Sequence, residues 1–96
     1  MAVKLQITPE LERVARNVVW FSDPQIIQRD PVFFLAQVMG YGTSSDVRTV
    51  WAQVGREGFK EAMEHLPKGI LDVRSIHFWG VMTDVDVTEA LKHARP

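Results

Sequence analysis

The sequence predicts an all-α protein, a compact bundle of five or six short helices around a buried central helix, with a short extended N-terminal arm. The central helix is predicted by the run PVFFLAQVMGY at residues 31–41, where Gln37 is the only polar residue between Val32 and Met39. A helix that is hydrophobic on all sides must be surrounded by other elements. The flanking segments instead place apolar residues on one helical face, which is typical of helices that cover a core.

Chain length and composition support the same fold class. The chain has 96 residues, of which 46% are hydrophobic, including three Trp and five Phe. This is enough for one domain with its own core and hardly enough for two. We therefore treat residues 1–96 as a single helical domain.

The N-terminal segment is expected to differ from the rest. Residues 2–7 alternate apolar and polar side chains, the pattern of a half-buried strand. A lone strand leaves its backbone groups unpaired, so this arm is expected either to lie on the helices or to pair with a second copy. Thr8 and Pro9 then begin a helix that should end near Trp20-Phe21.

Short sequence signals predict where the other helices begin and end. Asp-Pro pairs at residues 23–24 and 30–31 precede a short helix, which we expect Asp23 to cap, and the central helix. The segment Gly40-Tyr41-Gly42 should end the central helix, with glycine in a left-handed conformation. Thr43 and Asp46 have the spacing of a capping box, and the helical hairpin of residues 43–66 should break at Gly55. The last two helices are expected to start at Asp72 and Asp86.

Charge and composition exclude several classes of protein. The formal net charge is -1 with both signs interleaved, so no strong field would attract nucleic acid or an anionic membrane. Cysteine is absent, which removes disulfides and thiolate chemistry. The chain lacks a signal-peptide pattern and a long apolar run, so we expect a soluble cytoplasmic protein that does not enter the membrane.

No residue pattern indicates catalysis. The three histidines, His65, His77 and His93, have no metal-ligand spacing, and the serines lie in no nucleophile motif. Glycine-rich phosphate-binding loops are also absent. We therefore expect no catalytic residues, no metal and no cofactor, and a protein that is not an enzyme.

The hairpin of residues 43–66 allows one alternative function. Two short helices joined at a glycine are typical of a helix-turn-helix, which would make the protein a DNA-binding regulator contacting DNA through Arg48, Arg56 and Lys60. The second helix, residues 56–66, holds three Glu against one Arg and one Lys, whereas phosphate binding needs a cationic surplus. Nucleic acid is therefore the less favoured partner.

Two pairs of adjacent aromatic residues are more informative about function than the candidate catalytic and metal-binding motifs. They are Trp20-Phe21 and Phe78-Trp79. Adjacent side chains on a helix point about 100° apart, so both are buried only where the helix is covered on two sides. Either all four rings belong to the core, or one ring of each pair is a surface anchor for a partner.

The sequence also resembles an uncharacterised family of small helical bacterial and archaeal proteins. The matching segments are VVWFSDP at 18–24, YGTSSDVR at 41–48, the turn at 54–57 that leads to Phe59, and LDVRSIHFW at 71–79. The similarity covers about residues 18–85. It departs from the family where Val73 replaces a commoner proline and in residues 80–83.

Members of that family are often encoded beside nucleotidyltransferase-like toxins. The resemblance therefore implies an antitoxin or accessory role in a toxin-antitoxin or defence system, with the toxin-like enzyme as partner. It implies no catalytic residues.

Together these patterns predict a protein-protein interaction module. Its surface should combine the loop before residues 46–48 with the helix of residues 74–79, and a homodimer is also possible. Arg48 and Arg74 are expected either to contact the partner or to bridge to Asp23, Asp46 or Asp72. The candidate interaction residues are Trp20, Asp23, Asp46, Arg48, Arg74, Phe78 and Trp79.

Overall fold

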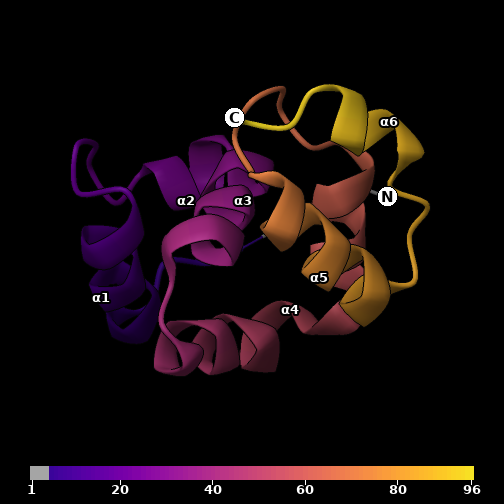
Figure 1. Cartoon of the computed structure of the whole chain (residues 1–96). Helices are drawn as coiled ribbons and strands as arrows, with labels where there is room; N and C mark the ends of the chain where they lie inside the picture. Colours follow the sequence, from indigo (N-terminus) through magenta and orange to yellow (C-terminus); the bar gives the residue numbers. More distant parts are fainter. Residues whose placement is uncertain (1–4) are drawn as a thin grey trace.

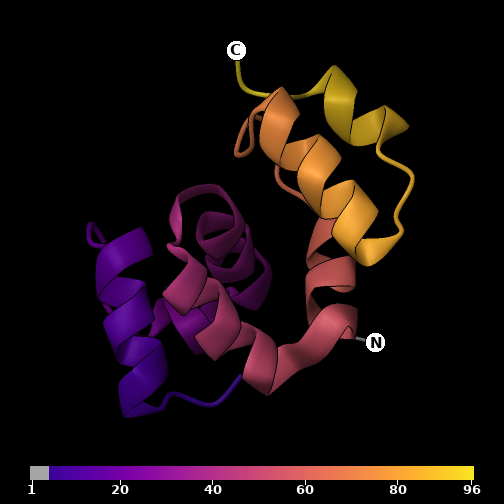
Figure 2. The same ribbon diagram turned by 60° about the horizontal axis from the view of Figure 1, so that its bottom comes forward.

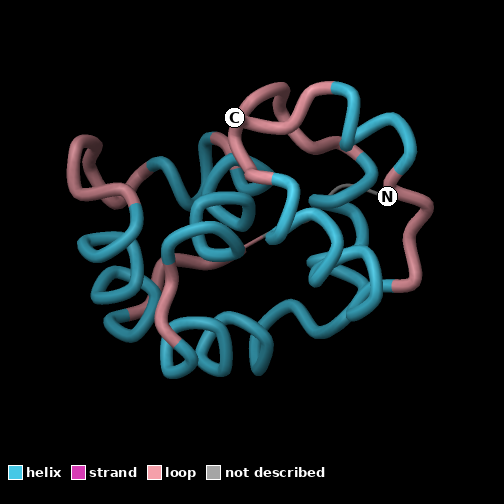
Figure 3. Tube along the Cα trace, in the orientation of Figure 1, coloured by secondary structure: helices cyan, strands magenta, loops and turns pink. Residues whose placement is uncertain are grey.

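The structure, a computed structural model that describes residues 5–96, is an all-α bundle (Figures 1 and 3). The described residues form six helices and no strand, which confirms the predicted fold class. The helices are α1 Pro9–Val18, α2 Ile26–Arg29, α3 Pro31–Tyr41, α4 Ser44–Glu64, α5 Val73–Thr83 and α6 Thr88–Lys92. The Cα trace measures 35 × 25 × 23 Å along its principal axes.

The apolar segment of residues 31–41 forms the central helix α3. It packs against α1, α2, α4 and α5, and every residue from Phe34 to Met39 is buried. Its single polar side chain, Gln37, donates from Nε2 to the carbonyl oxygen of Val18 at 2.9 Å. Because a carbonyl buried without a partner is costly, this bond explains a polar residue in the core and ties the end of α1 to α3.

The predicted arm is described only in part. Residues 2–4 lie outside the described part of the chain, and residues 5–8 belong to no strand. Leu5 is 6% exposed and packs into the main core. The described end of the arm therefore lies against the helices, and α1 begins where Thr8 Oγ1 accepts from the Leu11 N–H at 3.2 Å.

The left-handed cap predicted for the central helix and the Asp23 cap predicted for α2 are not formed. Helix α3 ends at Tyr41, within the predicted segment Gly40-Tyr41-Gly42, but the capping residue Gly42 has a φ of -72°, outside the left-handed region. Gly42 is needed for space instead, because a Cβ there would lie 2.7 Å from the Val38 carbonyl oxygen. Asp23 does not cap α2 directly but accepts from the Gln25 N–H at 2.8 Å, before the helix starts.

Helix α4 is two helices joined at a bend, as the sequence predicts. Thr43 and Asp46 form the capping box at its start, with Thr43 Oγ1 accepting from the Asp46 N–H at 3.2 Å and an Asp46 carboxylate oxygen accepting from the Thr43 N–H at 3.0 Å. Gly55 has φ 63° and ψ -173°, a conformation restricted essentially to glycine. Figure 2 shows the resulting bend of α4 beneath α5.

The C-terminal segment closes onto the loop before α5. The Gly69 N–H donates to the backbone carbonyl oxygen of His93 at 2.8 Å, and the Arg95 N–H donates to that of Leu71 at 2.8 Å. The Arg95 guanidinium also donates to the Tyr41 hydroxyl and lies 5.2 Å from the centre of that ring. Helix α6 starts at Thr88, two residues later than predicted, because Asp86 accepts from both the N–H and the hydroxyl of Thr88 before the helix begins.

Within residues 5–96, no helix combines the length and apolar character needed to cross a membrane.

Candidate functional site

A groove between the start of α4 and the outer face of α5 collects four of the seven predicted interaction residues. It has a volume of about 610 Å³. We call it the arginine groove, and its lining residues are Met39, Gly42, Ser44, Val47, Arg48, Arg74, Ser75, Phe78, Trp79 and Met82. Half of these side chains are large and apolar, and none is acidic.

The capping box fixes the α4 side of the arginine groove. Asp46 is 5% exposed, and besides its bond to Thr43 it accepts weakly from Asn17 on α1 at 3.4 Å. Because its carboxylate is used inside the fold, Asp46 does not present a free acid to the groove. The neighbouring residues Val47 and Arg48 follow in the first turns of α4 and line the groove.

The N-terminus of α5 fixes the other side. Asp72 accepts from the Ser75 N–H at 2.9 Å and so caps the helix, as predicted. Its hydrogen bonds with Ser75 hold the pKa of the Asp72 carboxyl below its usual value, with a further lowering from the nearby Arg95 charge. Ser75 itself lines the groove, so the cap sets the position of the helix face that carries Arg74 and Phe78.

The Phe78-Trp79 pair divides between core and surface. Trp79 is 3% exposed and donates from Nε1 to the Met39 carbonyl oxygen at 3.0 Å. Phe78 is 56% exposed, and its ring meets Trp79 edge-on with centroids 5.2 Å apart. The interpretation that all four tandem rings belong to the core is therefore wrong. For this pair, one ring is a core residue and the other faces the groove.

The two groove arginines have no acidic partner among residues 5–96. Arg48 and Arg74 are both exposed, and neither forms an ion pair with any residue that the structure describes. The predicted bridges to Asp23, Asp46 or Asp72 are thus not formed. Asp23 instead pairs with Arg29 at 3.8 Å, while Asp46 and Asp72 serve as helix caps. The groove consequently combines an apolar floor with two uncompensated positive charges.

Two predicted interaction residues lie elsewhere. Trp20 and Asp23 belong to the loop of residues 19–25 between α1 and α2, and they do not line the arginine groove. In this loop the adjacent rings of Trp20 and Phe21 are 76% and 57% exposed. Both members of this pair are therefore on the surface, where the sequence interpretation had expected at most one.

Three groove residues were not predicted: Met39, Val47 and Met82. Helical spacing assigns Met39 and Val47 to the core, and no local pattern indicates a hollow beside them. Met82 lies one helical turn after Phe78, and this i, i+4 pair on α5 is a sequence feature that indicates an exposed apolar face. The cavity itself depends on how far apart α4 and α5 sit, which is a tertiary property.

The three residues of the DNA-binding alternative do not line one common cavity. Arg48 lines the arginine groove, while Arg56 lies 4.0 Å from the carboxylate of Asp84. Lys60 lines a second cavity, together with acidic side chains that would repel phosphate. The positions of these residues therefore do not favour a DNA-binding face.

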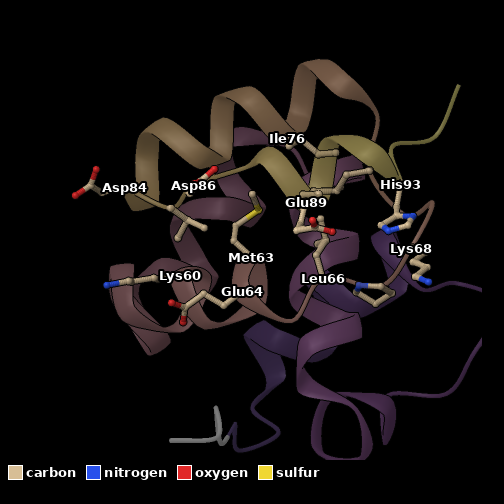
Figure 4. Close-up of a pocket in the computed structure, with 14 residues that line it drawn as sticks. Lys60, Met63, Glu64, Leu66, Lys68, Ile76, Asp84, Asp86, Glu89 and His93 are labelled. Carbon is tan, nitrogen blue, oxygen red and sulfur yellow. The ribbon is translucent and has the colours of Figure 1, made fainter.

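The second cavity lies between the latter half of α4, α5 and α6 and has a volume of about 660 Å³ (Figure 4). Its floor is apolar, with Met63, Leu66 and Ile76, and its rim mixes Lys60 and Lys68 with four acidic residues. Hydrogen bonds from Thr88 lower the pKa of one of these, Asp86. Among residues 5–96, no three His, Cys, Asp or Glu side chains gather as metal ligands, here or elsewhere.

Comparison with known proteins adds no relative. No protein-family model, no curated protein and no solved structure matches this chain.

Proposed function

We propose that the protein is a non-enzymatic interaction module whose arginine groove binds an acidic, partly apolar segment of another protein. The observation that carries this proposal is the pair of unpartnered arginines beside an apolar hollow. An exposed Phe78 and a 42% exposed Met82 are costly to leave in water unless a partner covers them. Arginines at the rim of an apolar patch select partners that bring carboxylates.

The partner that best fits the sequence resemblance is a nucleotidyltransferase-like toxin. In that case the protein acts as an antitoxin or accessory protein, and the groove holds an acidic segment of the toxin. This assignment of the partner rests on the resemblance, whereas the preference for an acidic apolar segment rests on the groove.

The groove can be tested with a defined probe. The probe is a short fluorescein-labelled peptide with two glutamates beside a Trp-Leu pair, and its binding is followed by fluorescence anisotropy. We expect binding that weakens with added salt and falls about tenfold or more in the Arg48→Glu/Arg74→Glu variant, since two attractive contacts become repulsive. A peptide with lysines in place of the glutamates should bind less well.

The matched control is Arg13→Glu, which reverses the charge of an exposed arginine on α1 that does not line the groove. It should leave peptide binding unchanged, and circular dichroism should show the same helix content in all variants. Equal affinity for the acidic and basic peptides would contradict the proposal. Salt-sensitive binding of duplex DNA that is lost in Arg48→Glu/Arg74→Glu would instead support the DNA-binding alternative.

The toxin assignment needs a separate experiment. The protein should capture a nucleotidyltransferase-like toxin, and Arg74→Glu should abolish capture while preserving the helical circular dichroism. Loss of both would assign Arg74 a structural role.

A further inference from the structure

We propose that the arginine groove also receives the exposed loop of a second copy of this chain, so that the protein associates with itself through residues 19–25. We call this segment the aromatic loop. The inference rests on the proposed function of the groove and names a second partner for it. Binding of the loop and binding of the acidic partner would then exclude each other.

The aromatic loop has the features of an inserting segment. Trp20 and Phe21 project from it with 76% and 57% of their surface exposed, and their rings meet edge-on at a centroid distance of 5.6 Å. The Phe21 ring also packs edge-on against the ring of Phe33, at a centroid distance of 6.3 Å. Two adjacent large rings that meet edge-on in an exposed loop form a preorganised apolar surface, which lowers the entropic cost of docking.

The loop and the groove are complementary in charge. Asp23 lies three residues after Trp20 and is 62% exposed. Its contacts to the Gln25 N–H and to Arg29 at 3.8 Å both use Oδ1, so Oδ2 can accept a hydrogen bond from outside. The pairing with Arg29 is long and exposed, and such pairs contribute little stability. A groove with two free arginines therefore offers Asp23 a better partner.

The sizes also agree. A buried Trp or Phe removes about 150–250 Å² from water, so two rings can cover the exposed Phe78 and Met82 together. The groove volume of about 610 Å³ is large enough to accept both rings. A single contact of this size lies below the ordinary range for a stable complex, and we expect weak association unless two copies dock reciprocally.

The loop cannot easily fill the groove of its own chain. In Figures 1 and 2 the connection between α1 and α2 lies at the left edge of the molecule, whereas α5 lies on the right. Each copy thus presents a loop and a groove at separate places. Such an arrangement produces either a closed dimer with two contacts or a head-to-tail chain of copies.

The test uses two variants with complementary defects. Trp20→Ser/Phe21→Ser removes the rings of the loop but keeps the groove, and Arg48→Glu/Arg74→Glu disables the groove but keeps the loop. Sedimentation equilibrium over a wide concentration range should show self-association of the wild type. Each variant alone should associate at least about tenfold more weakly. An equimolar mixture of the two should form a heterodimer held by one loop and one groove, weaker than the wild-type complex but tighter than the association of either variant alone.

Restoration by mixing distinguishes this contact from simpler ones. If the aromatic loops packed on each other, the groove variant would still self-associate and the mixture would gain nothing, which would overturn the inference. The Arg13→Glu control should associate like the wild type. Added glutamate-rich peptide should dissociate the wild-type complex, because it occupies the same groove.

The failures of the two proposals are separable. A wild-type protein that stays monomeric but binds the acidic peptide through Arg48 and Arg74 would overturn self-association alone. Self-association with the complementation pattern, together with no peptide binding to the Trp20→Ser/Phe21→Ser variant, would leave the second copy as the occupant and overturn the proposed heterologous partner. Failure of both measurements would remove any binding role for the groove.

Discussion

Two groups of aromatic rings in this molecule have opposite surroundings. Trp51, Phe59 and Trp79 stack in a column, with centroid distances of 5.4 and 4.9 Å and interplanar angles of 22° and 16°. Trp20, Phe21 and Phe33 instead meet edge-on, at 5.6 and 6.3 Å and angles of 85° and 75°. The column joins α4 to α5, whereas the edge-on group stands at the surface around the aromatic loop.

The comparison shows that Trp and Phe rings contribute to packing where other side chains cover them, and remain available for binding where they are exposed. The column is built across the bend at Gly55, so that Trp51 before the bend lies over Phe59 after it. Phe59 is completely buried, and Trp51 is partly covered. In the edge-on group, Trp20 and Phe21 are exposed and Phe33 is half-buried. We therefore expect the column to determine stability and the surface group to determine binding.

The largest effect should follow removal of the central ring of the column. Phe59→Ala should lower the free energy of unfolding by about 3–5 kcal/mol, because it removes buried apolar area and leaves a cavity. The measurement is urea unfolding in dilute protein. The same substitution at the exposed ring, Phe21→Ala, should cost less than about 1 kcal/mol. Equal losses at the two positions would end the distinction between the groups.

A substitution at the bend should act on the column without touching a ring. Gly55→Ala forces a side chain into φ 63°, ψ -173° and should destabilise the protein by about 1–3 kcal/mol. Near-ultraviolet circular dichroism should change as well, since Trp51 moves relative to Phe59. Gln53→Ala, an exposed change in the same helix, should alter stability by less than about 0.5 kcal/mol. An unchanged aromatic spectrum in Gly55→Ala would show that the bend does not set the stacking.

The third effect combines the loss of one buried hydrogen bond with the loss of part of a buried ring. Trp79→Phe keeps an aromatic ring in the column but leaves the Met39 carbonyl without its donor, and we expect a loss of about 1–3 kcal/mol in urea unfolding. Trp20→Phe makes the same chemical change on the surface and should leave stability within about 0.5 kcal/mol of wild type. A cost at Trp20 as large as that at Trp79 would contradict the assignment.

The smallest effect concerns the cap that orients α5 and depends on pH. Because the pKa of Asp72 in the folded protein lies below its usual value of 3.8, the carboxylate stabilises the fold above that pH. This contribution should be lost as the pH falls through the lowered pKa. Asp72→Ala should therefore be less stable than wild type at neutral pH, and the difference should shrink in acid. A gap that stays constant down to pH 2 would exclude the carboxylate as its source.

The sequence could predict the central helix, the capping box and the bend because each depends on residues close together in the chain. The almost entirely apolar run of residues 31–41 is stable as a helix only where other helices surround it. The spacing of Thr43 and Asp46 satisfies backbone N–H donors at the start of the next helix locally. Errors arose where a local signal competed with a neighbour. The end of α3 falls in the predicted segment Gly40-Tyr41-Gly42, yet Gly42 is required there by its close approach to the Val38 carbonyl oxygen and not by a left-handed φ.

The candidate site was only half predictable. Arg48, Arg74 and Phe78 were identified from a pattern, but their meeting in one groove depends on the distance between α4 and α5. Which ring of the adjacent pair on α5 is buried also depends on contacts with other helices. Phe78 and Trp79 differ by one position, and the carbonyl of Met39 on α3 together with the ring of Phe59 on α4 selects Trp79 for the interior.

The sequence by itself determined that this chain is helical, where most helices begin, and which one lies at the centre, because hydrophobic periodicity and caps act within a few residues. Tertiary structure decided which aromatic rings are buried and that two arginines would stand beside a hollow without acidic partners. Those outcomes depend on contacts between residues far apart in the chain, and no local pattern records them.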